Sequence, residues 1–315
     1  MKKILVTGAS GFIGQSLCKT LLKSGKSVRG VVRSLNSFSK NTNIEYVAVG
    51  DIVYKKDWKN ILADIDCIIH CAGRAHIMNE TKSDSLKFYR SVNVDVTKQL
   101  AEQAASAGVR RLVFLSSIGV LGMDTNNRKS FLYSDEINPT ENYAISKYEA
   151  EQALHQISNK TAIETIIIRS PLVYGPSAPG NLARLIKLVR SNVPLPFGMV
   201  NNKRSMVGID NLVDLLIRCI DHPDSAGKTF LISDGEDLST PDLIKHMSSS
   251  MGRKVYLFPV PVFLLKFVSR IFGKQKEIDR LVGSLKIDSN YTQETLKWTP
   301  PVNVSEGIRR MIQGR

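Results

Sequence analysis

Short, almost wholly apolar runs alternate with longer segments of helical periodicity along the first half of the chain. Six of these runs predict strands: KILVTG, SVRGVVR, IEYVAVGD, CIIHCAG, RLVFLSS and ETIIIRS. Strands covered by helices on both faces lack the polar alternation of a half-exposed sheet, and CIIHCA and RLVFL have that apolar composition. This order of elements predicts an α/β fold built on a parallel, doubly wound sheet.

The pattern changes after Arg169, where SPLVYGPSAPG and VPLPFG bring proline and glycine into the chain. A helix is predicted from Asn181, and a second one follows the Ser-Thr-Pro start of STPDLIKHM. We therefore expect one domain over residues 1–170 and a smaller α/β domain over 171–315. The apolar run TFLISD predicts a strand near 228–233 that returns to the first sheet.

The first predicted strand ends in VTGASGFIG, directly before a predicted helix. Gly8 permits a tight turn, Gly11 lets a pyrophosphate approach the backbone, and Gly14 lets the helix pack closely on the strand. The free amide groups and the dipole at a helix N-terminus bind phosphate. The stretch predicts a dinucleotide site, with a tight turn that binds nothing as the alternative.

The stretch NYAISKYEAE places Tyr143 and Lys147 four residues apart, and hence on one face of a predicted helix. An ammonium group beside a phenol favours the phenolate, so Lys147 is expected to lower the pKa of Tyr143 toward the range of an acid–base catalyst. Ser116 and Ser117 end the strand that precedes this helix. Together with the glycine turn, the Tyr-Lys pair predicts a catalytic site.

These motifs resemble the extended branch of the short-chain dehydrogenase/reductase superfamily, the nucleotide-sugar epimerases, dehydratases and reductases. IIHCAGRAH, SVNVDVT, VYGP and KWTPP extend the similarity over nearly the whole chain, in the family's order. The resemblance implies a Rossmann-like cofactor domain and hydride transfer between a nicotinamide and a sugar carbon. Tyr143 would exchange a proton with the sugar oxygen, Ser117 would hydrogen-bond that oxygen, and Lys147 would tune Tyr143 and hold the nicotinamide ribose.

The resemblance also implies which residues contact the cofactor. They are Gly8, Ser10, Gly11, Phe12, Ile13, Gly14, Arg33, Asp51, Ile52, Ala72, Gly73, Arg74 and Asn93, together with Tyr143 and Lys147. NAD-binding members carry an acid at the end of the second strand, where this chain has Arg33. Arg33 suits a 2′-phosphate and favours NADP(H), and NAD(H) with Arg33 stacked on the adenine stays open. Asp51 is the adenine-contacting acid by resemblance, with a solvated turn residue as the alternative.

The sugar nucleotide would be held, by the same resemblance, by Ser117, Asn181, Arg204 and Arg280. A solvated face is the alternative for single arginines in so basic a chain. Dehydratases carry an Asp-Glu pair after the serine position, whereas this chain continues Ile118-Gly119-Val120, which disfavours dehydration. Many UDP-sugar epimerases have an asparagine where this chain has Leu172, which weighs against an epimerase.

The stretches GRAH, PLPFG, NKRSMV and DGEDLSTPDL are most similar to a bacterial subgroup that makes UDP-N-acetylquinovosamine or UDP-N-acetylfucosamine. We therefore expect NAD(P)H-dependent reduction of the C4 keto group of a UDP-2-acetamido-2,6-dideoxy-hexos-4-ulose, for O-antigen or other surface polysaccharide. The alternative is a UDP-glucose or UDP-N-acetylglucosamine 4-epimerase with tightly bound NAD. A non-catalytic NADP-binding regulator is the alternative from another class.

Composition and charge add expectations about partners. The net charge of +14 predicts anionic ligands, but no dense Lys/Arg block with interleaved aromatics indicates nucleic acid. The four cysteines lack metal-ligand spacing, so we expect no metal and a reduced, cytoplasmic protein. Many relatives dimerise through two helices, the one that carries the Tyr-Lys motif and the one that precedes the serine strand, so the resemblance implies a homodimer.

The most lipid-like stretch is VYLFPVPVFLLKFVSRIFGK. Pro259, Pro261, Lys266 and Arg270 interrupt it well short of the roughly 20 apolar residues that a spanning helix needs. We expect a helix from near Pro261 with one apolar face packed in the smaller domain. A helix at the membrane surface, with Lys266 and Arg270 reaching lipid headgroups, is the alternative and would give weak membrane association.

Overall fold

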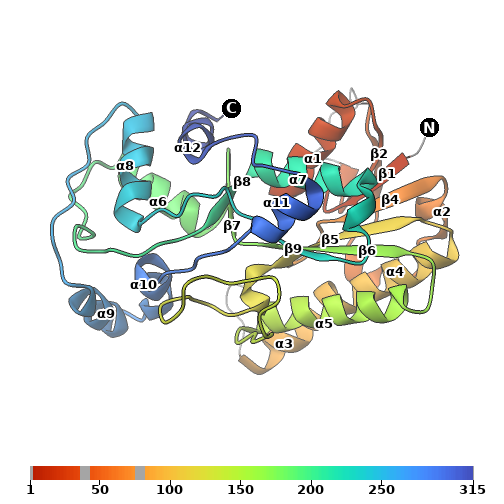
Figure 1. Ribbon diagram of the computed structural model, residues 1–315, viewed down its shortest axis with the longest axis horizontal. Helices are drawn as coiled ribbons and strands as arrows, with labels where there is room; N and C mark the ends of the chain where they lie inside the picture. The colour runs from red at the N-terminus through yellow and green to blue at the C-terminus, as the bar shows by residue number, and fades with distance from the viewer. Residues whose placement is uncertain (1–2, 36–42, 75–81, 315) are drawn as a thin grey trace.

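The computed structural model describes residues 3–35, 43–74 and 82–314, and its main feature is a parallel sheet of seven strands (Figure 1). The strand order is β3-β2-β1-β4-β5-β6-β9. The bounds are β1 (Lys3–Thr7), β2 (Ser27–Val32), β3 (Glu45–Ala48), β4 (Ile65–His70), β5 (Arg111–Ser117), β6 (Glu164–Ser170) and β9 (Thr229–Leu231). Every apolar run predicted as a strand is one, and the predicted α/β fold class is confirmed.

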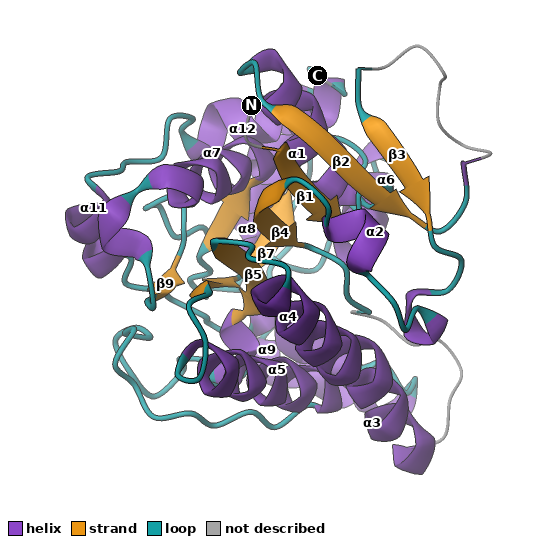
Figure 2. Cartoon of the chain, turned by 90° about the vertical axis from the view of Figure 1, so that its right-hand side faces the viewer, coloured by secondary structure: helices purple, strands orange, loops and turns teal. Residues whose placement is uncertain are grey.

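Helices cover both faces of this sheet (Figure 2). On one face lie α2 (Lys59–Leu62), α4 (Val96–Ser106) and α5 (Asn142–Ser158), and α3 (Lys82–Arg90) leads into α4. On the other lie α1 (Phe12–Lys23), α7 (Ile209–Asp221) and α11 (Asn290–Leu296). Successive side chains of a strand point to opposite faces, so Ile4 and Val6 pack with the second layer and Leu5 with the first.

A smaller unit follows residue 171. Its two parallel strands are β7 (Leu172–Tyr174) and β8 (Met206–Gly208). Its helices are α6 (Asn181–Arg190), α8 (Thr240–Ser250), α9 (Val262–Ile271), α10 (Gln275–Val282) and α12 (Val304–Gln313). The starts of α6, α8 and α9 agree with prediction, and Ser239 caps α8 by accepting a hydrogen bond from the amide of Asp242. The three-residue strands β7 and β8 were not predicted, because so short a run carries no periodic signal.

The two units share chain segments. β9 pairs with β6, as expected for residues near 228–233, and α7 and α11 pack on the large sheet although they follow residue 171. The core under the large sheet therefore takes residues from both sides of the expected boundary at residue 170, and the division into two domains stays a prediction.

Candidate active site

Two adjoining cavities lie at the carboxyl edge of the large sheet, where ligands bind in sheets of this type. The glycine-turn cavity, of about 790 Å³, lies over the turn between β1 and α1. The central cavity, of about 1140 Å³, is lined by both the large-sheet unit and the smaller unit. Cys71 and Gly73 line both cavities, so the two form one continuous cleft.

The turn between β1 and α1 needs glycine for two separate reasons. Gly8 has φ of +69°, and a Cβ there would lie 2.9 Å from the amide nitrogen of Ala72. A Cβ on Gly14 would lie 2.1 Å from the carbonyl oxygen of Gly8, so only glycine lets α1 approach this closely. Gly11 is the N-cap of α1 and lines the glycine-turn cavity. The free amides at the start of α1 and bare backbone thus lie together, an arrangement that fits a diphosphate.

The glycine-turn cavity brings together most of the residues expected to contact the cofactor. It is lined by Gly8, Ser10, Gly11, Arg33, Asp51, Ile52, Ala72, Gly73 and Arg74. Arg33 and Asp51 are exposed at its rim. Asp51 also caps a short 3-10 helix (Ile52–Tyr54) by accepting a hydrogen bond from the amide of Val53 at 3.2 Å. The hydrogen bond to Val53 agrees with the turn role, and the contact of Asp51 with the adenine stays a prediction.

Three residues expected at the cofactor lie behind the cavity walls. Phe12, Gly14 and Asn93 line neither cavity. Phe12 packs between the core of the large sheet and that of the smaller unit. The Asn93 side chain accepts a hydrogen bond from the Arg74 amide at 2.9 Å and donates one to Ser146 at 2.9 Å. Asn93 therefore fixes the loop after β4 against α5 and acts on the cavity through that loop.

The expected catalytic residues all line the central cavity. Ser117 is the last residue of β5, and its hydroxyl accepts a hydrogen bond from the amide of Gly119 at 3.1 Å. Tyr143 and Lys147 lie on consecutive turns of α5, as their spacing predicts. The Tyr143 ring packs at 6.0 Å from that of Tyr89, between ring centres. The structure thus brings a hydroxyl, a phenol and an ammonium group to one wall.

Lys147 is a buried cation, with only 4% of its surface exposed. Its Nζ lies 4.0 Å from the centre of the Phe114 ring, and among the described residues it has no hydrogen-bond acceptor. Burial lowers the pKa of Lys147 to about 8, although the nearby Glu151 and Cys71 oppose that shift. An ammonium group without a protein acceptor at a cavity wall is available to hydroxyl groups of a ligand.

The expectation that Lys147 lowers the pKa of Tyr143 is wrong for the protein on its own. Burial, and secondly the neighbouring Tyr89, raise the pKa of Tyr143 to about 12. Burial disfavours the charged phenolate because the phenolate would lose its hydration. The ammonium group of Lys147 lies over the Phe114 ring. Tyr143 is therefore a protonated phenol near neutral pH.

A buried ion pair lies beneath the catalytic residues. Glu151, one helical turn beyond Lys147, accepts a hydrogen bond from the Arg169 guanidinium at 2.7 Å and one from the hydroxyl of Ser116. Glu151 is 1% exposed and Arg169 6% exposed. These groups join α5 to β5 and β6, the elements that carry the catalytic residues. Sequence reasoning missed this pair, because a helical glutamate normally indicates a solvated face.

His70 forms a second buried network, under the glycine turn. Its Nδ1 lies 2.6 Å from the Thr7 hydroxyl and its Nε2 lies 2.9 Å from the Thr97 hydroxyl. The Ala72 amide donates to the Thr7 hydroxyl at 3.2 Å, which links His70 to the loop that lines both cavities. Burial lowers the pKa of His70 to about 3, so the imidazole is neutral and structural.

We expect this histidine to make the protein acid-sensitive. The unfolded chain protonates His70 near pH 6.5, whereas the folded protein resists protonation down to about pH 3. The unfolded state therefore binds more protons in that window, and stability falls as the pH decreases through it. Between about pH 7 and pH 5, the loss from this group is about 2 kcal/mol. Urea unfolding at both pH values should show a smaller loss in His70→Gln, and an identical loss in the two proteins would contradict the assignment.

Cationic groups converge at the other end of the central cavity. The Arg204 guanidinium donates to the carbonyl oxygens of Arg280 at 2.8 Å and Gly283 at 3.1 Å. Burial, and secondly the charge of Arg280, lower the pKa of Arg204 to about 10. Asn181 begins α6 at the same cavity. Arg204 and Arg280 both line this end of the cavity, and guanidinium groups can hold an anion such as a diphosphate.

Several residues of this cavity were not found from the sequence. They are Glu141, Arg184, Lys274 and Lys276. Glu141 accepts a hydrogen bond from Arg280 at 2.8 Å and so joins the start of α5 to α10. Single charged residues in so basic a chain carry no spacing signal that would have identified them. Leu172, on β7, also lines the cavity, so no side-chain amide stands at that position.

A parallel sheet with a phosphate-type glycine turn, and a Ser-Tyr-Lys set beside it, define an enzyme of the NAD(P)-dependent short-chain dehydrogenase/reductase class. Residues 4–233 match the NAD dependent epimerase/dehydratase family, and the chain belongs to that family. It is therefore an enzyme of the family and not a protein of another class.

Relatives of known function fit this assignment. The chain is 40% identical over 314 residues to a UDP-glucose 4-epimerase of Vibrio cholerae. The aligned region covers 99% of this chain and 95% of the relative. It is 24% identical to the N-acetyl-alpha-D-glucosaminyl-diphospho-ditrans,octacis-undecaprenol 4-epimerase of Escherichia coli O157:H7, over 98% of this chain and 94% of that one.

Solved structures show the same fold. A UDP-glucuronic acid 4-epimerase of Bacillus cereus, solved in complex with UDP-glucuronic acid and NAD, superposes with a TM-score of 0.80. The match covers 99% of this chain and 98% of that chain at 23% sequence identity. A dTDP-glucose 4,6-dehydratase of Bacillus anthracis, solved in complex with NAD, gives a TM-score of 0.77 at 18% identity. Since epimerase and dehydratase superpose almost equally well, the fold alone does not choose the reaction.

Proposed function

We propose that this protein is a 4-epimerase of a sugar nucleotide, with UDP-glucose or UDP-N-acetylglucosamine as substrate and NAD retained through the reaction cycle. The observation that carries the proposal is the 40% identity, over nearly the full length of both chains, to a UDP-glucose 4-epimerase. The relative from Escherichia coli O157:H7 is also named as a 4-epimerase of a sugar on a diphosphate. These similarities favour the alternative over the main expectation from the sequence, the 4-keto reductase.

The residues of the central cavity can perform this inversion. When bound, the nicotinamide supplies the acceptor that takes the C4 hydride and returns it to the opposite face. Tyr143 takes the proton of the C4 hydroxyl in the first step and gives it back in the second. Ser117 hydrogen-bonds the same oxygen. The first step needs Tyr143 as the phenolate, whereas burial favours the phenol; the ammonium group of Lys147, protonated below about pH 8, would oppose that effect of burial when the substrate is bound.

The opposite end of the cavity suits the nucleoside diphosphate. Arg204 and Arg280, the latter also paired with Glu141, bring two guanidinium groups to it, and α6 begins there at Asn181 with the positive end of its dipole. The diphosphate would then lie beside the smaller unit and the sugar beside Tyr143.

A second candidate, the NADPH-dependent 4-keto reductase, is favoured by one feature. Arg33 is exposed at the rim of the glycine-turn cavity, where it can meet a 2′-phosphate. Asp51 lines the same rim and can instead meet the hydroxyl groups of an NAD ribose. A reductase receives its hydride from a new NADPH in every cycle, whereas an epimerase regenerates its NAD.

The nucleotide released from freshly purified protein on denaturation separates the two candidates. We expect close to one NAD per chain, in both the wild-type protein and Arg33→Ala, because the epimerase does not use Arg33 for a phosphate. The reductase would be established instead by three results together. The purified protein would contain no nucleotide, it would bind NADPH in preference to NAD, and Arg33→Ala would reduce this preference at least tenfold.

A further inference from the structure

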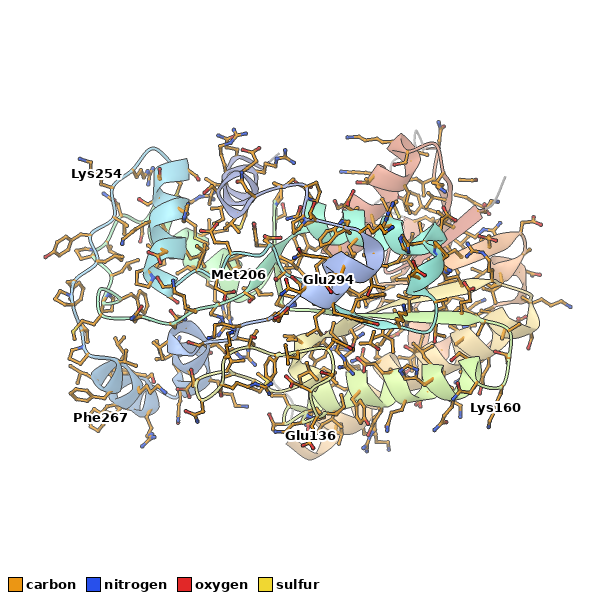
Figure 3. All side chains as sticks on the ribbon, viewed as in Figure 1. Glu136, Lys160, Met206, Lys254, Phe267 and Glu294 are labelled. Atoms are coloured by element: carbon orange, nitrogen blue, oxygen red, sulfur yellow. The ribbon has the colours of Figure 1, made fainter. Side chains whose placement is uncertain are left out.

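Helix α9 exposes an unusually apolar surface at the end of the smaller unit. Phe263, Phe267 and Ile271, spaced one turn apart and so on one face, are 74%, 60% and 66% exposed. Phe272 is 73% exposed, and Leu264 and Val268 widen the same face. The side chains of α9 that are buried in the protein are Leu265 and Ser269. Figure 3 shows Phe267 pointing away from the protein at the extreme end of the molecule.

Positive charge borders this apolar face. Residues 262–276, which hold α9 and the segment after it, contain four lysines and arginines and no aspartate or glutamate. Lys266 and Arg270 are exposed on α9 itself, along the border between its apolar face and its buried side. Lys274, just after the helix, is exposed as well. Lys266 also pairs with Asp279 on α10 at 3.2 Å, which orients its ammonium group without neutralising the region.

We propose that α9 docks on the surface of an anionic phospholipid bilayer. Phe263, Phe267 and Ile271 would enter the boundary between headgroups and acyl chains, and the surrounding lysines and arginines would meet lipid phosphates. A second copy of this chain fits the surface poorly, because a two-fold contact would set its cations against an identical set. In the part of the chain that the structure describes, no helix is long and apolar enough to cross a membrane, so contact through α9 is at the surface.

This docking would orient the active site. α9 packs against α10 (Figure 1), and α10 with the segment before it contributes Lys274, Lys276 and Arg280 to the central cavity. The mouth of that cavity would therefore lie close to the bilayer, with the far edge of the large sheet pointing away. The docking itself does not depend on the proposed epimerase activity.

Vesicle flotation tests the proposal without any sugar or nucleotide. The full-length protein should float with vesicles of phosphatidylglycerol and phosphatidylethanolamine and bind at least tenfold less to vesicles of phosphatidylcholine. Salt at about 1 M, where the Debye length is about 3 Å, should weaken the binding. Replacing Phe263 and Phe267 together by serine should reduce it at least tenfold, whereas Tyr54→Ser, which removes an 80% exposed aromatic from the large-sheet unit, should stay within twofold of wild type.

The oligomeric state and the fold of the variants complete the test. The double serine variant should keep the wild-type far-UV circular dichroism and the wild-type sedimentation coefficient. Equal binding to anionic and neutral vesicles, or no loss of binding in a folded double variant, would overturn the proposal. Dissociation of a wild-type oligomer in the double variant would also overturn it, by assigning the face to a second copy of the chain.

Discussion

Replacing Tyr143 by phenylalanine is expected to lower kcat by about a hundredfold to ten-thousandfold, the range that one positioned acid–base group contributes. The ring lies at the wall of the central cavity and packs near Tyr89, so phenylalanine keeps its shape and loses only the phenol. Cofactor content and the unfolding midpoint should change little. The measurement is steady-state turnover of a UDP-sugar together with the amount of nucleotide bound.

Tyr148→Phe provides a matched control on the same helix. Tyr148 lies five residues further along α5, and its hydroxyl accepts a hydrogen bond from Gln152 at 3.1 Å, outside both cavities. Its loss should leave turnover within about twofold of wild type, as expected for a surface substitution. Near-native turnover in Tyr143→Phe, or an equal loss in both variants, would show that Tyr143 is not the proton-transfer group.

Glu151→Gln is expected to lower the free energy of unfolding by about 3 kcal/mol, because it leaves the buried Arg169 without its counter-charge. It should also change the pH profile. Glu151 raises the pKa of Lys147, so its neutralisation should lower that pKa from about 8. Since the proposal needs the protonated lysine, the alkaline limb of kcat/KM should move to lower pH. Chemical denaturation and a pH–rate profile measure the two effects.

Glu149→Gln separates a charge effect from the effect of burial. Glu149 lies on α5 and pairs with Arg90 on the protein surface, with an oxygen–nitrogen distance of 2.6 Å. A partly exposed pair contributes little, so this variant should unfold like the wild type and keep its alkaline limb. If Glu151→Gln is less stable but the alkaline limb of its kcat/KM profile is unchanged, Glu151 has a purely structural role. Full stability in Glu151→Gln would show that the ion pair contributes nothing to folding.

Local features of the chain predicted the elements and the glycine turn well. The strands inside the large sheet are apolar runs covered by helices on both faces, so their pattern depends little on distant residues, whereas the edge strand β3 is largely exposed. Gly8 and Gly14 are dictated by backbone geometry within a single turn, and their spacing carries that information. Tyr143 and Lys147 share a helix, so their common face follows from the helical period.

Features that depend on distant pairing were not predictable in the same way. Glu151 meets Arg169 and Ser116, and His70 meets Thr7 and Thr97, through contacts that exist only once the sheet is assembled. The pKa of Tyr143 was predicted in the wrong direction for the same reason, because burial outweighs a neighbouring charge whose strength was judged from spacing alone. The placement of Asn93 behind the cavity wall also depends on how the loop after β4 folds.

The choice between epimerase and reductase rests on a difference that neither spacing nor fold expresses. Both reactions use the same hydroxyl, phenol and ammonium groups, and they differ in whether the hydride comes back from the same cofactor molecule. Leu172 and Arg33 suggested the reductase from the sequence, whereas similarity over the full length favours the epimerase.

The fate of the hydrogen at C4 tests the epimerase proposal most directly. Purified protein, with no nicotinamide cofactor added, is incubated with UDP-glucose that carries deuterium at C4 of the sugar, and the products are followed by NMR. The proposal predicts that the C4 epimer forms to equilibrium and that the deuterium stays at C4, because the same cofactor takes it and returns it. If no epimer forms, and turnover instead requires a 4-keto sugar nucleotide and added NADPH, the proposal is contradicted.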